Sequence, residues 1–378
     1  GIPVDAPFTD VVRNAGIPIW SEIELAYHYG KGKIAAITGT NGKTTTTALV
    51  GEIVKAHNAK TIVVGNIGIP YTELCDTTDD DSDTVAEISS FQLETVIDFH
   101  PNVSAILNLT PDHLNRHYTF ENYGNVKFSI TKNQTMDDVT VLNYDDEHTR
   151  AMGEKAKDHC HVVYFSRLEK PAGGVYVEDG DIILEDGDKK INVLAIKDLK
   201  LMGAHNVENV LAAVGISYYM GVPVDVIRDV ATSFKAVAHR IEYVDTVDGV
   251  AYYNDSKGTN PDAAIKGIQA MVAPTFLIGG GYDKGSEYDE WIEAFDGKVK
   301  WLVLIGQTAQ KIADCAKRHG FNSIIFEENL QDAVAYCHEN AVDGDAVLLS
   351  PACASWGQFD NYEQRGDMFK EYVRSYKE

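Results

Sequence analysis

Positive charge is scarce in this chain of 378 residues. Lysine and arginine together number 33 against 57 aspartates and glutamates, which gives a formal net charge of −24 at pH 7. Such an excess of negative charge would be repelled by the phosphate backbone of a nucleic acid and by anionic lipid. We therefore expect neither a nucleic acid nor a membrane surface as a partner, and any anionic ligand must be held by a local site.

Cysteine and long apolar runs are also rare. The five cysteines are widely spaced and form no Cys-x-x-Cys pair, which argues against a zinc ribbon or a redox motif. Reduced thiols in a cytosol are the simplest interpretation. No apolar run approaches the roughly 18 residues of a membrane helix, and the opening GIPVDAPF lacks the basic flank and apolar core of a signal peptide. We expect a soluble, cytoplasmic protein.

Short β-rich runs alternate with helical stretches from Lys33 onward. The runs are KIAAIT, TIVVG, DTVAEIS, VSAILNLT, VTVLNY and HVVYF. Apolar runs separated by helices are typical of a parallel sheet that is covered on both faces. Over residues 174–196, two Asp-Gly turns between alternating strands predict an antiparallel meander. Helices are predicted from about His205 to Gly221 and from Pro223 to about Phe234.

A second unit is predicted from about Val237, because the chain is too long for one ordinary core. RIEYVDTVDGVAYYND reads as a hairpin, and PTFLIGGG, VKWLVLIG, NSIIF and DAVLLS follow as strands with amphipathic segments between them. This pattern indicates an open sheet of Rossmann type. The expected fold class is therefore α/β: a central P-loop-type parallel-sheet domain with an antiparallel meander, followed by a C-terminal Rossmann-like domain.

The stretch AAITGTNGKTTTTA, residues 35–48, carries the strongest chemical signal. Its glycines let backbone N–H groups converge on an anion, Lys43 can reach the β- and γ-phosphates of a nucleotide, and a threonine hydroxyl can approach Mg²⁺. Ile37 stands where the common P-loop spelling has its first glycine. The weaker alternative is a flexible glycine turn with a solvated lysine. The candidate phosphate-binding residues are Gly39, Thr40, Asn41, Gly42, Lys43, Thr44 and Thr45.

Acidic side chains and a histidine follow later strands of the first unit. Glu87, in AEISSFQLE, stands near the C-terminal end of a strand, where open parallel sheets place their ligands. A Mg²⁺ ligand and a capping or salt-bridged glutamate are equally supported there. NLTPDHLNRH places Asp112 and His113 after the next strand. A lone histidine is usually structural, but one beside an aspartate at the rim of a phosphate loop favours contact with substrate or metal.

Polar loops also follow strands of the second unit. NDSKGTNPDA carries Asp255, Lys257 and Thr259, which suit anion and nucleotide contacts, although an ordinary Asn/Asp/Gly turn has the same composition. GGGYDKG offers a glycine bend with Lys284, a weak signal alone. In SPACASWGQFDNYEQRG, the serines and Tyr362 can hydrogen-bond a small polar ligand, or the aromatics can belong to the core.

Together these strings resemble the Mur ligase family, the ATP-dependent amide-bond ligases of peptidoglycan assembly. ITGTNGKTTT, EISSFQLE, NLTPDHL, GAHNVENVLAA, HRIE, NDSKGTN, GG-x-x-DKG and SPACASWGQFDNYEQRG occur in the family's order, from about residue 33 to the end. SSFQLE combined with SPACAS and EQRG is most similar to the member that adds D-glutamate to UDP-N-acetylmuramoyl-L-alanine.

The resemblance implies a reaction. The γ-phosphate of ATP activates the carboxylate of UDP-N-acetylmuramoyl-L-alanine as an acyl phosphate, and the amine of D-glutamate then attacks it. The implied cofactors are ATP and Mg²⁺, or Mn²⁺ in its place, together with a carbamylated lysine, and we expect a monomer. Two alternatives stay open: a muramyl ligase for another amino acid, and a P-loop ATPase or nucleotide-sensing module that hydrolyses ATP without ligation.

The resemblance also implies roles for single residues. Lys43 and Thr44 serve the phosphate and the metal, Glu87 is a Mg²⁺ ligand, and His113 lies beside a second metal and the substrate. Lys127 matches the lysine that this family carbamylates, although the residues alone indicate a surface lysine. The implied nucleotide contacts are Asn206, Asn209, Arg240 and Asp255, and the implied substrate contacts are Asn66, Ser89, Lys257, Thr259, Lys284, Ser355 and Tyr362.

Three domains are expected from the same resemblance. Residues 1–22 would be the remnant of an N-terminal UDP-binding domain with its linker, residues 23–236 the central ATP-binding domain, and residues 237–378 the C-terminal ligase domain that binds the amino acid. A chain that retains so little of the first domain should bind the UDP substrate poorly. Nucleotide contacts from both larger domains predict a cleft that closes to assemble the site.

Overall fold

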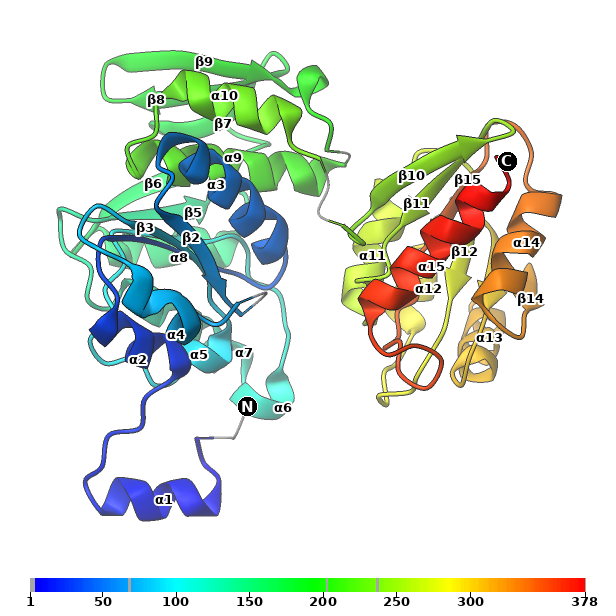
Figure 1. The fold of residues 1–378 in the computed structure, drawn as a ribbon, viewed down its shortest axis with the longest axis horizontal. Coiled ribbons are helices and arrows are strands. Elements are labelled where there is room, and N and C mark those ends of the chain that lie inside the picture. The colour runs from blue at the N-terminus through cyan, green and yellow to red at the C-terminus, as the bar shows by residue number, and fades with distance from the viewer. Residues whose placement is uncertain (1–3, 67–68, 202, 236–237, 378) are drawn as a thin grey trace. The chain divides into compact units, whose positions relative to one another are not determined.

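The computed structural model describes residues 4–66, 69–201, 203–235 and 238–377. The chain forms two compact units: one runs to Lys200 and resumes over His205–Phe234, and the other combines Leu201–Ala204 with the chain from Lys235 onward. Each unit has its own sheet with helices against it (Figure 1), which confirms the α/β class. The expected domain boundary at residues 236 and 237 lies outside the described residues.

The first unit contains one continuous sheet with the strand order β2-β3-β1-β4-β5-β6-β7-β8-β9. Its strands are parallel as far as β7, and β7, β8 and β9 then form the predicted antiparallel meander. The strands are β1 (Lys33–Thr38), β2 (Thr61–Gly65), β3 (Asp83–Glu87), β4 (Val103–Ile106), β5 (Val139–Asn143), β6 (His161–Ser166), β7 (Gly174–Glu178), β8 (Asp181–Asp186) and β9 (Lys189–Ala195).

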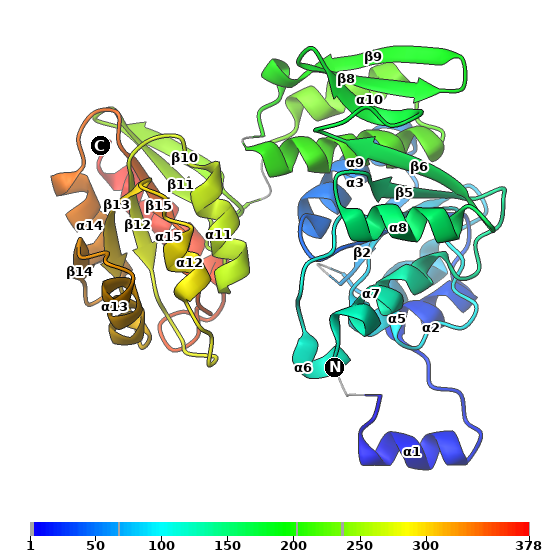
Figure 2. The same ribbon diagram turned by 180° about the vertical axis from the view of Figure 1, so that it is seen from behind.

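Helices lie on both faces of this sheet, as the two opposite views of α3 and α8 show (Figures 1 and 2). The α-helices are α1 (Pro7–Asn14), α2 (Glu22–Tyr29), α3 (Lys43–His57), α4 (Tyr71–Leu74), α5 (Ser90–Leu93), α6 (Leu114–His117), α7 (Phe120–Phe128), α8 (Glu147–Ala156), α9 (Ala204–Tyr219) and α10 (Val224–Ser233). Short 3₁₀ turns are η1 (Cys75–Thr77), η2 (Ser129–Thr131) and η3 (Ile196–Asp198).

The second unit has the strand order β10-β11-β15-β12-β13-β14, with the predicted hairpin β10–β11 at one edge and parallel pairing elsewhere. Its strands are β10 (Glu242–Val247), β11 (Val250–Asn254), β12 (Thr275–Gly279), β13 (Val299–Leu304), β14 (Ile324–Phe326) and β15 (Ala346–Leu349). Its helices are α11 (Pro261–Ala270), α12 (Asp289–Glu293), α13 (Ala309–Arg318), α14 (Leu330–Asn340) and α15 (Tyr362–Ser375).

The central strands of the second unit are apolar on both sides, because each face packs on helices. Along β12, Leu277 joins the hydrophobic cluster under α11, α12 and α13, whereas Phe276 and Ile278 join the cluster under α14 and α15. Successive side chains of a strand point to opposite faces, so a strand covered twice is apolar throughout. This burial explains the continuous apolar run in PTFLIGGG.

The parallel register brings separate loops to one edge of each sheet. In the first unit, Glu87 at the end of β3 pairs with Ile37 in β1 and with Gly65 in β2. In the second unit, Leu349 at the end of β15 pairs with Asn254 in β11 and with Ile278 in β12. The loops that carry the candidate residues therefore meet at the carboxyl ends of the strands, the usual ligand edge of such sheets.

None of the helices in the described part of the chain combines the length and the apolar character that crossing a membrane requires.

Candidate functional site

The loop between β1 and α3 requires its two glycines. Gly39 has φ 147° and Gly42 has φ 85°, both in the region that L side chains rarely adopt. A Cβ atom on Gly42 would lie 2.3 Å from Oδ1 of Asn209, and one on Gly39 would lie 3.0 Å from the Cβ of Leu107. The helix α3 starts directly after Gly42, so its first N–H groups lie at the end of this turn, where helices bind anions.

Residues after β4 hold the phosphate loop in place. The backbone N–H of Asn41 donates to Oδ1 of Asn108 (2.8 Å), and Nδ2 of Asn108 donates back to the Asn41 carbonyl (3.1 Å). Oγ1 of Thr40 contacts the Thr110 carbonyl (3.1 Å) and the hydroxyl of Tyr123 (3.2 Å). Sequence reasoning missed Asn108 and Tyr123 in this role, although the NLTPDH string contains the first of them.

Two lysines meet at a single carbonyl of the loop. Nζ of Lys43 donates to the carbonyls of Gly39 (2.8 Å) and Thr40 (2.9 Å). Nζ of Lys127, from α7, donates to the same Gly39 carbonyl (2.9 Å) and lies 3.3 Å from Oγ1 of Thr38. The structure therefore brings the amines of Lys43 and Lys127 together at the Gly39 carbonyl, and their assigned roles stay predictions.

Lys127 corrects the interpretation that rested on the residues alone. It is 1% exposed and its Nζ lies 4.8 Å from the centre of the Tyr123 ring, so it is not a surface lysine. Burial, and secondly the nearby charge of Lys43, hold the pKa of the Lys127 amine well below its usual value. A depressed pKa increases the fraction of neutral, nucleophilic amine near neutral pH.

Glu87 presents one carboxylate oxygen without a partner. The residue is 1% exposed; its Oε1 accepts a hydrogen bond from Nδ2 of Asn66 (2.8 Å), and its Oε2 has no hydrogen-bond partner among the described residues. Among the described residues, Glu87 caps no helix and forms no ion pair within 4 Å, although its charge acts on the buried Lys127 amine. A buried carboxylate oxygen without a donor is costly unless a cation neutralises it, so the Oε2 atom suits a Mg²⁺ ligand.

His113 and Ser89 flank this edge. His113 is exposed, has φ 52°, and its ring lies 4.8 Å from that of Phe91 in α5. Its Nε2 is 3.6 Å from Oδ2 of Asp112. Ser89 caps α5 through a capping box with Gln92. The hydroxyl of Ser89 therefore has a structural role in addition to its assigned substrate contact, which stays a prediction.

The two asparagines of α9 pack against the phosphate loop and α3. Oδ1 of Asn209 accepts from Oγ1 of Thr46 (3.3 Å), and Nδ2 of Asn209 donates to Oδ1 of Asn206 (3.0 Å). Both asparagines are buried. At the start of α3, Thr45 is also buried, whereas Thr44 is half-buried. Asn209 therefore lies beside Gly42 and Thr46, and the assignment of both asparagines to the nucleotide stays a prediction.

In the second unit, Asp255 is the first residue of the loop after β11, and it is fully buried. Its Oδ2 accepts a hydrogen bond from Oγ of Ser350 (2.7 Å). Burial raises the pKa of Asp255 to about 6, while the charge of Arg240 and the Ser350 hydroxyl act in the opposite direction. The charge of Arg240 therefore acts on Asp255, and the assignment of both residues to the nucleotide stays a prediction.

The raised pKa of Asp255 predicts a pH dependence of stability. Between about pH 4 and pH 6 the folded state holds a proton that the unfolded state has lost, so stability falls as pH rises through this window, by up to about 3 kcal/mol. Asp255→Asn should remove this dependence and raise the melting temperature at about pH 8. Melting curves at about pH 5 and pH 8 measure it, with exposed Asp314→Asn as the control. An unchanged pH slope in Asp255→Asn would contradict the prediction.

Arg365 is a buried residue of the second unit that sequence reasoning missed. It is 1% exposed, and its guanidinium donates to Oγ of Ser256 (2.9 Å), to the Ser256 carbonyl (2.7 Å) and to the Cys353 carbonyl (3.2 Å). Oγ of Ser256 donates in turn to the Tyr362 carbonyl (2.8 Å). Through these hydrogen bonds, Arg365 of the EQRG string links this string to the NDSKG and SPACAS strings.

The candidate residues for the amino acid are only partly brought together. Nζ of Lys257 lies 5.4 Å from the centre of the Tyr362 ring, and Thr259 follows on the same loop. Lys284 is exposed on the loop after β12, and Ser355 is buried beyond β15. The bridge between Tyr282 and Ala354 pairs these last two loops. The assignment of these residues to one pocket stays a prediction.

The fold and the site define a class: an α/β protein with a P-loop-type turn between a strand and a helix, followed by a Rossmann-like unit. Residues 37–217 match the model of the Mur ligase middle domain, and residues 239–353 match that of the Mur ligase, glutamate ligase domain. The chain belongs to the Mur ligase family, which confirms the predicted resemblance.

Curated relatives and solved structures agree with this membership. The chain is 58% identical to UDP-N-acetylmuramoylalanine–D-glutamate ligase of Lachnospira eligens, covering 99% of this chain and 83% of that protein. It is 49% identical to the ligase of the same name from Clostridioides difficile, covering 100% and 83%. The structure of UDP-N-acetylmuramate-alanine ligase MurC from Thermotoga maritima is similar in fold, with TM-score 0.68, 20% identity, and coverage of 99% and 84%.

Proposed function

We propose that this chain is an ATP-dependent amide-bond ligase that joins D-glutamate to UDP-N-acetylmuramoyl-L-alanine in peptidoglycan precursor synthesis. The observation that carries the proposal is 58% identity, over 99% of the chain, to a relative named for that reaction. The P-loop-type turn with Lys43 supplies the chemistry that such a ligase needs for ATP. The expected cytoplasmic location and monomeric state stay predictions.

In the proposed reaction, the substrate carboxylate attacks the γ-phosphorus of ATP, and the bond from the γ-phosphorus to the bridging oxygen breaks to leave ADP. The amine of D-glutamate then attacks the acyl phosphate, and the tetrahedral intermediate loses phosphate to give the amide. Both reactants of the first step are anions, so the ammonium of Lys43 and the N–H groups at the start of α3 lower the barrier by holding the phosphates.

The residues at the edge of the first sheet fit Mg²⁺. Oε2 of Glu87 is a buried carboxylate oxygen that no described residue partners, Thr44 supplies a hydroxyl at the start of α3, and His113 borders the same edge. Oxygen ligands together with phosphate are what Mg²⁺ prefers, and Mn²⁺ tolerates the same set. When bound, the metal neutralises charge that develops on the transferred phosphoryl group.

We also propose that Lys127 is carbamylated. Its neutral Nζ would attack the carbon of CO₂, forming an N–C bond and releasing a proton to solvent, which leaves an anionic group. Burial favours the step because it depresses the pKa of the amine. The product would place an anion beside the Lys43 ammonium, which attracts it, where a protonated Lys127 would be repelled.

Lys127→Ala should reduce ligation on the order of 100-fold. Acetate or formate should restore part of this loss, because a small carboxylate can occupy the place of the carbamate. Wild-type activity should also fall in CO₂-depleted buffer and toward acidic pH, where the amine is protonated. The measurement is the rate of ADP formation, with exposed Lys132→Ala as the control. Full activity of Lys127→Ala without added carboxylate would refute the role.

The choice of amino acid is tested by the product. The chain is incubated with ATP, Mg²⁺ and UDP-N-acetylmuramoyl-L-alanine together with D-glutamate, L-glutamate or L-lysine, and the products are identified by mass spectrometry. We expect an amide only with D-glutamate. Lys257 and Lys284 suit an amino acid with two carboxylates and disfavour L-lysine, and the expectation of the D form rests on the relatives named for D-glutamate. An amide with a different amino acid would replace the proposal by that of a sibling ligase.

A further inference from the structure

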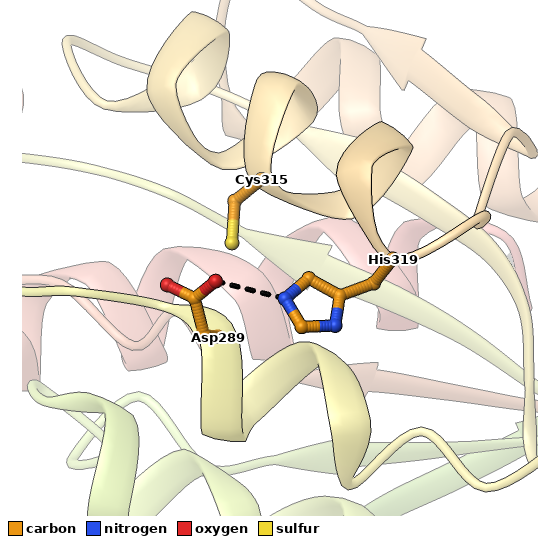
Figure 3. A group of neighbouring side chains, drawn as sticks. All are labelled: Asp289, Cys315 and His319. Carbon is orange, nitrogen blue, oxygen red and sulfur yellow. Dashed lines mark hydrogen bonds and ion pairs between the residues drawn. The ribbon is translucent and has the colours of Figure 1, made fainter.

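A second group of metal-ligating side chains lies in the second unit, outside all residues assigned above. Asp289 opens α12, Cys315 lies in α13, and His319 follows directly after that helix. One ligand atom from each residue lies within 4.8 Å of the other two. Figure 3 shows the three side chains pointing toward one another from the two helices. We propose that these residues bind Zn²⁺, or a similar transition-metal ion, in a site that clamps α12 to α13.

The chemical types favour a borderline-soft cation. Thiolate, imidazole and carboxylate are each ligands of Zn²⁺, whereas Mg²⁺ and Ca²⁺ prefer oxygen alone. Cys315 and His319 are four residues apart, so α13 places both on one side. Binding would release the thiol proton to solvent and leave a sulfur anion on the metal.

The geometry needs only small shifts. Nε2 of His319 is 2.8 Å from Oδ1 of Asp289. A tetrahedral Zn²⁺ ion with bonds of about 2.0 to 2.3 Å separates its ligand atoms by about 3.3 to 3.8 Å. The imidazole and carboxylate must therefore separate by about 0.5 Å. No two of the ligand atoms are more than 4.8 Å apart, so the other pairs must approach by about 1 Å at most. The side chains of His319 and Asp289 are 26% and 44% exposed, so both can move and the ion has access.

Two neighbouring charged side chains have opposite effects on metal binding at this site. Oε1 of Glu293 lies 3.7 Å from Nδ1 of His319, the ring nitrogen that faces away from the proposed ion. A carboxylate there orients a ligating histidine and increases its basicity. Arg318 competes for the site, since its Nη2 lies 3.5 Å from Oδ1 of Asp289. That guanidinium is 60% exposed and can turn to solvent when the ion binds.

The clamp would fix a loop that matters for the proposed ligand site. Asp289 directly follows Tyr288, whose hydroxyl is 3.1 Å from Sγ of Cys353 in the SPACAS string. The same loop carries Lys284. A metal that joins Asp289 to α13 would therefore hold the segment between Lys284 and the buried core in one position, without any contact to the reacting groups.

Cobalt provides the test, because a cobalt–thiolate bond gives an intense near-ultraviolet absorption that oxygen ligands do not. The whole chain is freed of metal with a chelator and titrated with Co²⁺ in excess Mg²⁺, which keeps oxygen sites occupied. We expect one equivalent to give the thiolate band, with Zn²⁺ displacing it. Cys315→Ser should lose the band, and His319→Gln should weaken binding on the order of 100-fold.

The other described group of three close ligands is the matched control. Glu24, His28 and Asp98 also place their ligand atoms within 4.8 Å of one another, but they include no sulfur. His28→Gln should leave the band and the affinity unchanged. Circular dichroism checks that each variant folds, and His319→Gln tests the site even if Cys315→Ser does not fold. No band in the wild type, or an unchanged band in either ligand variant, would overturn the proposal.

Discussion

Lys43→Ala is expected to reduce ATP turnover on the order of a thousandfold while leaving the fold intact. The Lys43 ammonium lies against the carbonyls of Gly39 and Thr40 at the start of α3, where it can reach the phosphates of a bound nucleotide. No other described residue of this loop carries a positive side chain. The measurement is the rate of ADP formation at saturating ATP and D-glutamate.

Lys55→Ala is the matched control for this variant. Lys55 lies on the same helix, α3, but it is exposed in its last turn. It should keep the wild-type rate, which separates a local role of Lys43 from a general effect of lost charge. A Lys43→Ala variant that retains more than about a tenth of the wild-type rate would show that the loop does not act as a phosphate cradle.

Glu87→Gln is expected to reduce ligation by about 100-fold or more and to raise the Mg²⁺ concentration needed for half-maximal activity. The variant removes the negative charge at the unpartnered Oε2 and keeps an acceptor for Asn66. In the absence of Mg²⁺, however, its melting temperature should equal or exceed that of the wild type, because an uncompensated buried charge is removed. Ligation and melting are both measured as a function of Mg²⁺.

Glu24 is a buried carboxylate of the same unit, but unlike Glu87 it accepts hydrogen bonds at both of its oxygens. Its oxygens accept backbone N–H donors from Ile97, Asp98 and Phe99, at 2.9, 2.8 and 3.1 Å. Glu24→Gln should therefore lower stability by about 1 to 3 kcal/mol without changing the Mg²⁺ requirement. If Glu87→Gln behaved in this way instead, Glu87 would be a structural glutamate and not a metal ligand.

Local sequence signals predicted most of the fold. The β1 strand covers the predicted KIAAIT, and the meander β7–β9 and the hairpin β10–β11 follow their Asp-Gly turns. These features depend on residues close together in the chain, such as a glycine that alone tolerates φ 85° at residue 42. The strand-to-helix position of the phosphate loop was predictable for the same reason.

Features that depend on distant partners were not predictable from residue types. Nothing in the NYGNVKF string indicates that Lys127 is buried, because its burial arises from the packing of α7 against the turn at Gly39. The same holds for Arg365, whose partners Ser256 and Cys353 come from two other loops. Asn66, which donates to Oε1 of Glu87, likewise follows another strand.

The central claim is that the γ-phosphate of ATP passes to the substrate carboxylate before the amide forms. UDP-N-acetylmuramoyl-L-alanine labelled with oxygen-18 in its carboxylate tests this directly, when it is incubated with the chain, ATP, Mg²⁺ and D-glutamate. The account predicts that each phosphate released carries one labelled oxygen, in step with amide formation. Unlabelled phosphate, released at the same rate without D-glutamate, would contradict the account and favour a plain ATPase.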